Sequence, residues 1–234
     1  MSPRPVSGAL PAYLRIAEHL TIEIGAGRLR PGERLPPERR MAARYGVSPM
    51  TLRKALAIVA ERGLIARRQG SGNYVREGTR RRDLGTYALF RLEAVPDGGG
   101  LPTAEVLSFE AEAGPGPGAL GPARRIRRLR RLDGLAAAVE EIWLATRHGE
   151  LTAADLSESL YRTYERVLGL GIARAEDRVS LAPCPGWVPE TFRPAPGATT
   201  GLVERQGFDP YGALAEVSRT WFDPGRARYF ATVP

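Results

Sequence analysis

The stretch that most constrains the fold runs from Gly46 to Val59, where a tight turn precedes an amphipathic helix. Gly46 suits the turn because glycine accepts a positive φ without a Cβ clash, and Ser48 can cap the first free amides of the helix. The apolar residues recur at i, i+3, i+4 and i+7 and predict one buried stripe: Leu52, Ala55, Leu56 and Val59. The other face is partly basic: Pro49, Met50, Arg53 and Lys54. A tight turn followed by such a helix is typical of a helix-turn-helix, whose second helix enters the major groove of DNA. The alternative is a small amphipathic helix with a solvated basic face.

The neighbouring segments predict two more helices and a hairpin. A first helix is predicted to begin at Pro11, in its first position, and to end at Gly25 to Gly27. A short second helix is predicted over Pro37 to Tyr45, again with proline first. After Gly63, two short strands on either side of residues 69–72 predict a β-hairpin. Three helices and a hairpin together predict a winged helix.

The motifs in this region resemble the GntR family of bacterial transcription regulators over most of residues 10–76. They are Leu29 to Pro36, Glu38-Arg39, Ser48 to Arg53, and Gly63-Leu64-Ile65 followed by Gln69-Gly70-Ser71-Gly72. The resemblance implies eight DNA-binding residues: Arg39, Ser48, Pro49, Met50, Thr51, Arg53, Gln69 and Gly70. It implies that Arg39 contacts phosphate or guanine, Ser48 and Thr51 contact phosphate, Arg53 reads a guanine, and Gly70 approaches the minor groove.

Alternatives remain for several of these residues. Arg39 can instead pair with Glu38 or Glu33 on the surface, and Arg53 can be an ordinary solvated residue. Met50 can contact a thymine methyl group or pack against the hairpin. Two positions also depart from the family: Pro37 replaces a common serine, and Pro49 replaces a common arginine, which removes one contact and favours a different operator preference.

The charge of the chain is unevenly distributed. Residues 1–82 hold 17 basic and 6 acidic residues, a net charge of +11, whereas residues 83–234 hold 17 and 20, a net charge of −3. A basic excess confined to one folded motif indicates a nucleic-acid partner. A basic helix on a membrane surface is the competing interpretation, and the glycine and proline turns disfavour it.

Composition also predicts the compartment. Cys184 is the only cysteine, so no intrachain disulfide is possible and a reducing cytoplasm is expected. No apolar run approaches the roughly 18 residues of a membrane span. Met1 to Ala9 lacks the apolar centre of a signal peptide and is expected to be a loose arm.

The remainder of the chain predicts a second domain of the α+β class, with a mostly antiparallel sheet and few helices. We expect domains at residues 1–76 and 86–234, joined by a polar linker at 77–85. Asp133-Gly134 predicts a hairpin between two strands. Further strands are predicted within 86–93, 104–112, 124–144, 172–182, 201–208, 213–222 and 226–233. Helices are predicted over 151–168, with Thr152 as N-cap, and over 187–193.

The second domain resembles the UTRA effector-binding domain of the HutC-type branch, whose fold is similar to chorismate lyase. The residues that carry the resemblance are Arg128-Leu129-Arg130 before Asp133-Gly134, Val139 to Leu144, Ser159-Leu160-Tyr161, Leu202 to Arg205, and Glu216-Val217-Ser218 before Arg228-Tyr229-Phe230. The resemblance implies an effector pocket that contains Arg128, Arg130, Glu140, Ser159, Tyr161 and Glu216. Ala137-Ala138 and Cys184 to Trp187 depart from the family pattern and leave the ligand open.

Strand alternation places Arg128 and Arg130 on one face, where two guanidinium groups can bind a carboxylate or phosphate. The alternative is a solvated ladder that faces Glu140 or Glu141 across the hairpin. Trp143, Tyr161, Trp221 and Tyr229 are expected to be core residues more than ligand-stacking ones.

No motif of an enzyme is present: His19 and His148 are isolated, and there is no Walker loop or nucleophile elbow. We therefore expect no catalytic residue, no metal site and no cofactor. A chorismate-lyase-like enzyme and a winged helix used only for protein contact are the alternatives. The prediction is a cytoplasmic, homodimeric repressor that binds an inverted-repeat operator and responds to a small anionic effector, with no membrane partner.

Overall fold

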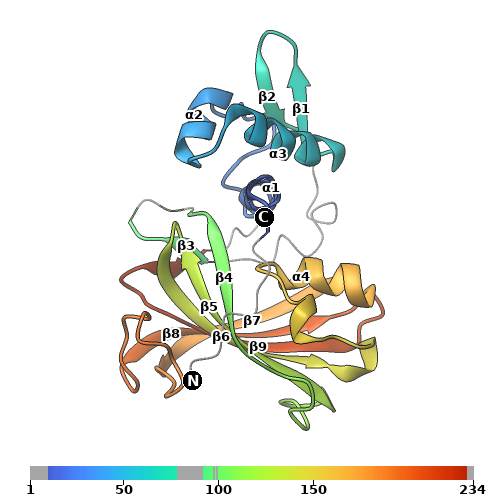
Figure 1. Ribbon diagram of the computed structural model, residues 1–234, viewed down its shortest axis with the longest axis vertical. Helices are drawn as coiled ribbons and strands as arrows, with labels where there is room; N and C mark the ends of the chain where they lie inside the picture. Colours follow the sequence, from blue (N-terminus) through green and yellow to red (C-terminus); the bar gives the residue numbers. More distant parts are fainter. Residues whose placement is uncertain (1–9, 78–91, 97, 99, 231–234) are drawn as a thin grey trace. The chain divides into compact units, whose positions relative to one another are not determined.

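A computed structural model describes residues 10–77, 92–96, 98 and 100–230 (Figure 1). These residues form two compact units: an N-terminal one, which consists of residues 10–77 and also includes Phe230, and a C-terminal one from Leu92 to Tyr229. The predicted arm at 1–9, the linker after Glu77 and most of the strand predicted at 86–93 lie outside the described residues.

The N-terminal unit contains the predicted three helices and hairpin. The helices are α1 (Ala12–Gly25), α2 (Glu38–Arg44) and α3 (Pro49–Glu61), and the hairpin strands are β1 (Ile65–Arg68) and β2 (Gly72–Val75). Pro11 and Pro37 are the N-cap residues of α1 and α2, whereas they were predicted to occupy the first helical position. Their ψ angles of 139° and 138° are extended, which places them outside the helix.

The core of this unit is built on the predicted stripe of α3. Leu52, Ala55, Leu56 and Val59 are all buried. They pack with residues of the other elements: Ile16, Ala17, Leu20 and Ile24 of α1, Met41 and Ala42 of α2, and Leu64, Ile65 and Val75 around the hairpin. The helix-turn-helix and its wing therefore share one apolar core.

The C-terminal unit is an antiparallel six-stranded sheet in the order β4-β5-β6-β9-β8-β7 (Figure 1). Its strands are β4 (Pro102–Glu110), β5 (Ala123–Leu132), β6 (Leu135–Ala145), β7 (Arg174–Pro183), β8 (Thr199–Phe208) and β9 (Leu214–Phe222). A separate pair joins β3 (Leu92–Ala94) to β10 (Ala227–Tyr229). Asp133 and Gly134 both have positive φ, 48° and 81°, as a type I′ hairpin turn requires. The predicted α+β class is confirmed.

Two helix predictions in this unit are wrong. The segment 151–168 is not one helix but a 3-10 turn at Ala153–Asp155, an extended connection, the single turn α4 (Leu160–Thr163) and a π turn at Tyr164–Leu168. Thr152 does cap the start, as predicted, because it forms a capping box with Asp155. The segment 187–193 consists of turns and bends with no helix.

An apolar cluster covers one face of the sheet. Cys184 and Phe192, in the loop after β7, pack with Leu129, Val139 and Trp221 on one face. Gly201 of β8 lies directly opposite Phe222 of β9. The Phe222 ring lies so close over Gly201 that an added Cβ would overlap it. This contact fixes the register of β8 against β9.

Candidate functional site

The turn before α3 is locked by local hydrogen bonds. The Oγ of Ser48 accepts the amide of Thr51 at 3.1 Å and lies 2.9 Å from the Thr51 hydroxyl. Pro49 occupies the first helical position, and Gly46 has a φ of 61°. The N-terminus of α3 is thus presented by a side-chain cap and a glycine turn, as the sequence predicted.

Seven of the eight predicted DNA-binding residues are exposed and Thr51 is half-buried. The exposed ones are Arg39, Ser48, Pro49, Met50, Arg53, Gln69 and Gly70. The Met50 side chain is 62% exposed, so it does not pack against the hairpin. These residues come from the starts of α2 and α3 and from the tip of the wing.

Arg53 is held by a carboxylate from α2. Its Nε donates to Glu38 Oε2 at 2.9 Å, while 58% of the Arg53 side chain stays exposed. The hydrogen bond from Arg53 is the largest effect on Glu38 and holds the pKa of that carboxyl below its usual value. Glu38 thus binds Arg53 rather than Arg39, and Glu33 accepts the amide of Arg30 at 2.9 Å. Arg53 is neither buried nor simply solvated.

The wing adds basic groups that the sequence reasoning did not single out. Arg67 and Arg68 end β1 and are exposed beside the tip. The Arg68 guanidinium lies 4.4 Å from the centre of the Tyr74 ring, a cation–π distance. The Tyr74 hydroxyl in turn hydrogen-bonds the Ser71 hydroxyl at 2.7 Å, which ties the tip of the wing to β2. The signal for these residues was the Arg-Arg pair before the glycine tip.

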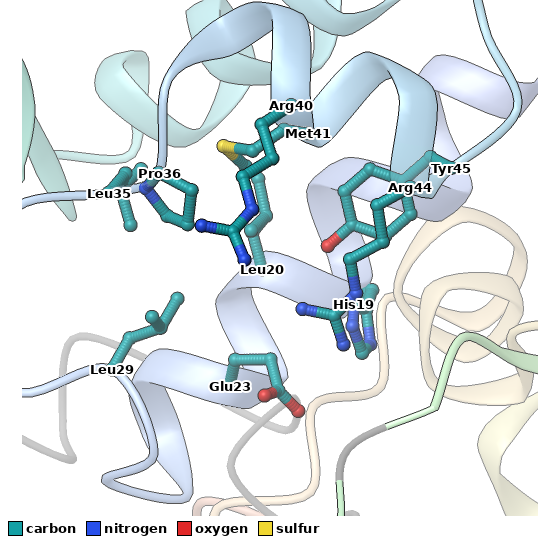
Figure 2. A pocket seen from close by; sticks show the side chains of 10 residues that line it. All are labelled: His19, Leu20, Glu23, Leu29, Leu35, Pro36, Arg40, Met41, Arg44 and Tyr45. Carbon is teal, nitrogen blue, oxygen red and sulfur yellow. The ribbon is translucent and has the colours of Figure 1, made fainter. Parts of the chain in front are cut away.

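A pocket of 510 Å³ lies in the same unit, on the side of α2 that faces α1 (Figure 2). Its lining is His19, Leu20, Glu23, Leu29, Leu35, Pro36, Arg40, Met41, Arg44 and Tyr45. The guanidinium groups of Arg40 and Arg44 point into this space from α2. The one lining carboxylate, Glu23, already binds Arg28 at 2.7 Å. The pocket therefore adds positive charge apart from the predicted DNA contacts.

In the C-terminal unit, Arg128 and Arg130 converge on Glu140. Arg128 donates to Glu140 Oε2 from Nε at 3.0 Å and from Nη2 at 2.5 Å. The Nη1 of Arg130 lies 3.5 Å from Glu140 Oε1. The cross-hairpin pairing considered as an alternative is present, but the pair is not solvated, because Arg128 is 4% and Glu140 8% exposed.

Tyr161 and Glu216 lie beside this pair. The Tyr161 hydroxyl donates to Glu216 Oε1 at 3.3 Å and accepts from Arg205 Nη1 at 3.4 Å. Arg205 makes two further bonds, at 2.6 and 2.7 Å, to Asp177 of β7. The Tyr229 hydroxyl also donates to Asp177, at 2.7 Å. We call Arg128, Arg130, Glu140, Tyr161, Asp177, Arg205, Glu216 and Tyr229 the polar cluster.

The structure brings together five of the six predicted effector residues. Ser159 is the exception among the described residues: it is the N-cap of α4, and its carbonyl accepts from the Thr163 hydroxyl at 3.1 Å. Its neighbour Glu158 does reach the cluster, because the Glu158 carbonyl accepts from Arg128 at 3.2 Å. Arg205, Asp177 and Tyr229 were not predicted, and Tyr161 and Tyr229 are polar members rather than core residues.

Burial sets the protonation of the cluster. Burial raises the pKa of Glu140, but the charges of Arg128 and Arg130 outweigh it, so that the pKa lies below its ordinary value. Burial raises the pKa of Glu216, and the neighbouring Tyr164 hydroxyl and the charge of Arg205 oppose this only in part. The pKa of the Tyr161 hydroxyl is raised by burial and by Glu216. Three buried or half-buried guanidinium groups converge here, on Glu140 and on Asp177, and guanidinium groups are well suited to bind oxyanions.

Other kinds of site are not evident in the part of the chain that the structure describes. No group of three or more His, Cys, Asp and Glu side chains is placed to hold a metal ion there. None of the described helices is both long and apolar enough to cross a membrane.

Comparisons with known proteins point to one family. Residues 12–75 match the model of bacterial regulatory proteins of the gntR family, and residues 118–228 match the model of the UTRA domain. The chain is 48% identical over 231 residues to the HTH-type transcriptional regulator SmoD of Agrobacterium fabrum, which covers 97% of each protein. It is 31% identical over 186 residues to the mannosyl-D-glycerate transport/metabolism system repressor MngR of Escherichia coli, which covers 74% of this chain and 75% of MngR.

The fold has solved counterparts as well. The crystal structure of the possible transcriptional regulator YydK from Bacillus subtilis matches with a TM-score of 0.53 and 18% identity, over 96% of this chain and 100% of that one. The matched proteins are named as transcriptional regulators and not as enzymes.

Proposed function

This chain belongs to the GntR family of bacterial regulatory proteins, as a transcriptional regulator with a UTRA domain, and we propose that it is a homodimeric repressor released by a small anionic metabolite. Domains at residues 1–76 and 86–234, with a linker at 77–85, and a cytoplasmic location are part of this proposal. The observation that carries it is the capped, exposed start of α3, with Arg53 held by Glu38.

The DNA-binding part of the proposal assigns roles to the exposed residues. Arg53 reads a guanine, because its planar fork fits O6 and N7 and such a pair discriminates by about 1–3 kcal/mol. Arg39, Ser48 and Thr51 contact phosphates, and Gln69 and Gly70 bring the wing to the minor groove. Pro49 and Met50 contribute apolar contacts at the start of α3, where relatives of this family commonly have an arginine at the first position.

The effector part of the proposal rests on the polar cluster. Arg128, Arg130 and Arg205 are the cationic groups that would bind the ligand's anionic group, and Glu140, Tyr161 and Glu216 would accept or donate hydrogen bonds. Ser159 is proposed as a further contact. The name of MngR supports an anionic ligand class, because glycerate is a carboxylate, and it also supports a repressor role.

The homodimer follows from the way such domains read DNA. Two recognition helices related by a two-fold axis bind successive major grooves about 34 Å apart, on an inverted repeat. A ligand that binds one domain arrangement more tightly than the other shifts DNA affinity by that difference.

The test is a fluorescence-anisotropy titration of the Arg53→Ala variant with the duplex from the chain's own promoter and with single-base variants of that duplex. We expect weaker binding and relaxed choice at one base-pair position, by about 1–3 kcal/mol. Arg219→Ala is the matched control, since it removes the same charge from a partly exposed position in the sheet. Unchanged affinity and unchanged specificity of Arg53→Ala would refute the assignment of α3.

A further inference from the structure

One edge of the six-stranded sheet is a long strand without a bulge, whose charged residues are confined to its first half. β7 is the outer strand, and its ten residues pair with β8 without a register shift. Val179 is 52% and Leu181 74% exposed, although both are apolar. They alternate along the strand and so lie on the same face. A long, regular edge strand with apolar side chains is a template for pairing with another chain.

The opposite edge of the sheet has the expected protection. β4 begins at Pro102 and contains a bulge between Val106 and Ser108. Its outer residues Glu105 and Glu110 form ion pairs with arginines of β5, at 3.4 and 2.6 Å. Proline, bulges and charges are the common means of blocking edge-to-edge contact. β7 also has charges, in its first half, and ends at Pro183, but its segment from Val179 to Ala182 is uncharged and pairs without a bulge. This segment is therefore the better template for a partner strand.

The β7 sequence is complementary to itself in one antiparallel register. When Ser180 faces the partner's Ser180, Val179 lies opposite the partner's Leu181, and the same contact recurs on the other side of the two-fold axis. Arg178 then lies opposite the partner's Ala182, so no like charges meet. A register centred on Glu176 would instead oppose two glutamates and place Arg174 against the partner's Arg178.

We propose that two copies of this chain pair through β7, antiparallel and centred on Ser180, to join their two sheets into one. A two-fold contact of this kind is self-complementary and closed, as most homodimer interfaces are. The inference rests on the proposed function, which requires a homodimer, and it deepens that function by placing the dimer interface.

The same strand reaches the polar cluster. Asp177 of β7 binds Arg205 through both carboxylate oxygens, at 2.6 and 2.7 Å, and lies four residues before Leu181. The strand proposed as the interface therefore carries a residue of the polar cluster. Occupation of the cluster by an anion that competes with Asp177 for Arg205 changes the strand on which the two copies meet.

The first experiment measures the oligomeric state of the full chain by analytical ultracentrifugation. Leu181→Lys places two lysines at the two-fold contact and is expected to raise the dimer dissociation constant by about 100-fold or more. Leu135→Lys is the matched control, because Leu135 is 61% exposed at a hairpin turn away from the β7 edge. Far-UV circular dichroism and the melting temperature check that both variants are folded.

The second experiment tests the register by disulfide cross-linking in a Cys184→Ala background. Residues directly opposite in an antiparallel pair have Cα atoms about 4.5–5.5 Å apart, within disulfide range. Ser180→Cys is therefore expected to give a covalent dimer on oxidation. Glu176→Cys is expected not to, because its two copies would lie roughly 27 Å apart along the strands.

A dimer that persists in Leu181→Lys, together with no cross-link in Ser180→Cys, overturns the β7 interface. If that dimer still binds the promoter duplex, the proposed function stands and only the interface is wrong. A wild-type chain that is monomeric and does not bind the duplex overturns both.

Discussion

Arg53 illustrates how a single residue is prepared for its proposed role. A long arginine side chain loses about 0.5–1.5 kcal/mol of rotational freedom when a partner immobilises it. The hydrogen bond from Arg53 to Glu38 restricts the side chain before any nucleic acid is present. This bond uses Nε, while more than half of the side chain remains exposed. The carboxylate of Glu38 thus positions the guanidinium at the start of α3.

At the same scale, the protonation of Glu216 gives a pH prediction. Because burial raises its folded-state pKa, the stabilisation from the protonated form is complete below the unfolded pKa, about 4.3, and is lost as the pH rises through the folded pKa. We expect Glu216→Gln, which mimics the protonated form, to gain melting temperature over wild type increasingly from pH 5 to pH 8.

Differential scanning calorimetry at several pH values measures this difference. Glu190→Gln, at an exposed position, is the control and should show no such trend. A Glu216→Gln variant whose advantage shrinks with rising pH would contradict the raised pKa.

The residues of the polar cluster were only partly predictable from the sequence. Arg128 and Arg130 alternate along one strand and could be placed on one face, and the family resemblance added Glu140, Tyr161 and Glu216. Asp177 and Arg205 were not predicted as members of the cluster. Their contact arises from the pairing of β7 with β8, which no local sequence pattern encodes. Arg128 also differs from the solvated ladder that was the alternative, because it is buried and donates to the Glu158 carbonyl, just before α4.

At the scale of elements, the predictions succeeded where turn and capping residues agreed with the apolar periodicity. Gly46, Ser48 and the stripe of α3 act together over a few residues, so the helix begins where predicted. The segment 151–168 has apolar residues at helical spacing, but its capping box with Asp155 closes only one turn, and Leu156 then has an extended backbone. Apolar spacing alone could not distinguish one helix from several turns packed on the same face.

The contact between Gly201 and Phe222 gives a stability prediction. Any side chain at residue 201 must displace a buried aromatic ring, and overpacking of a core costs about 1–3 kcal/mol. We expect Gly201→Ala to lower the free energy of unfolding by that amount in urea titrations.

Gly186→Ala serves as the control, since an added Cβ there meets no atom within 4 Å. Equal stability of the two variants would show that Phe222 can move aside, and that the contact does not fix the register.

At the scale of the whole molecule, the basic charge is concentrated in the first 82 residues. If these residues bind DNA phosphates, the affinity must fall as the salt concentration rises. The logarithm of the binding constant then falls against the logarithm of the salt concentration with a slope of about −0.9 for each phosphate neutralised. We expect Arg39→Ala to reduce this slope by about 1 without changing the preferred sequence. Arg130→Gln, in the second domain, is expected to leave the slope unchanged.

Titrations at four or more salt concentrations, with specific and scrambled duplexes, measure the slope. An Arg39→Ala variant with the wild-type slope would remove Arg39 from the phosphate contacts, and a changed base preference would reassign it to base reading.

Cys184 gives the molecule a built-in chemical reporter. It is the only thiol in the chain, it is buried beside Trp221, and burial raises its pKa. A thiol reagent can therefore modify the native protein only when the segment after β7 opens. The rate of that single reaction measures how often the segment after β7 opens locally. A change in this rate upon addition of a metabolite would detect binding of the metabolite without any label.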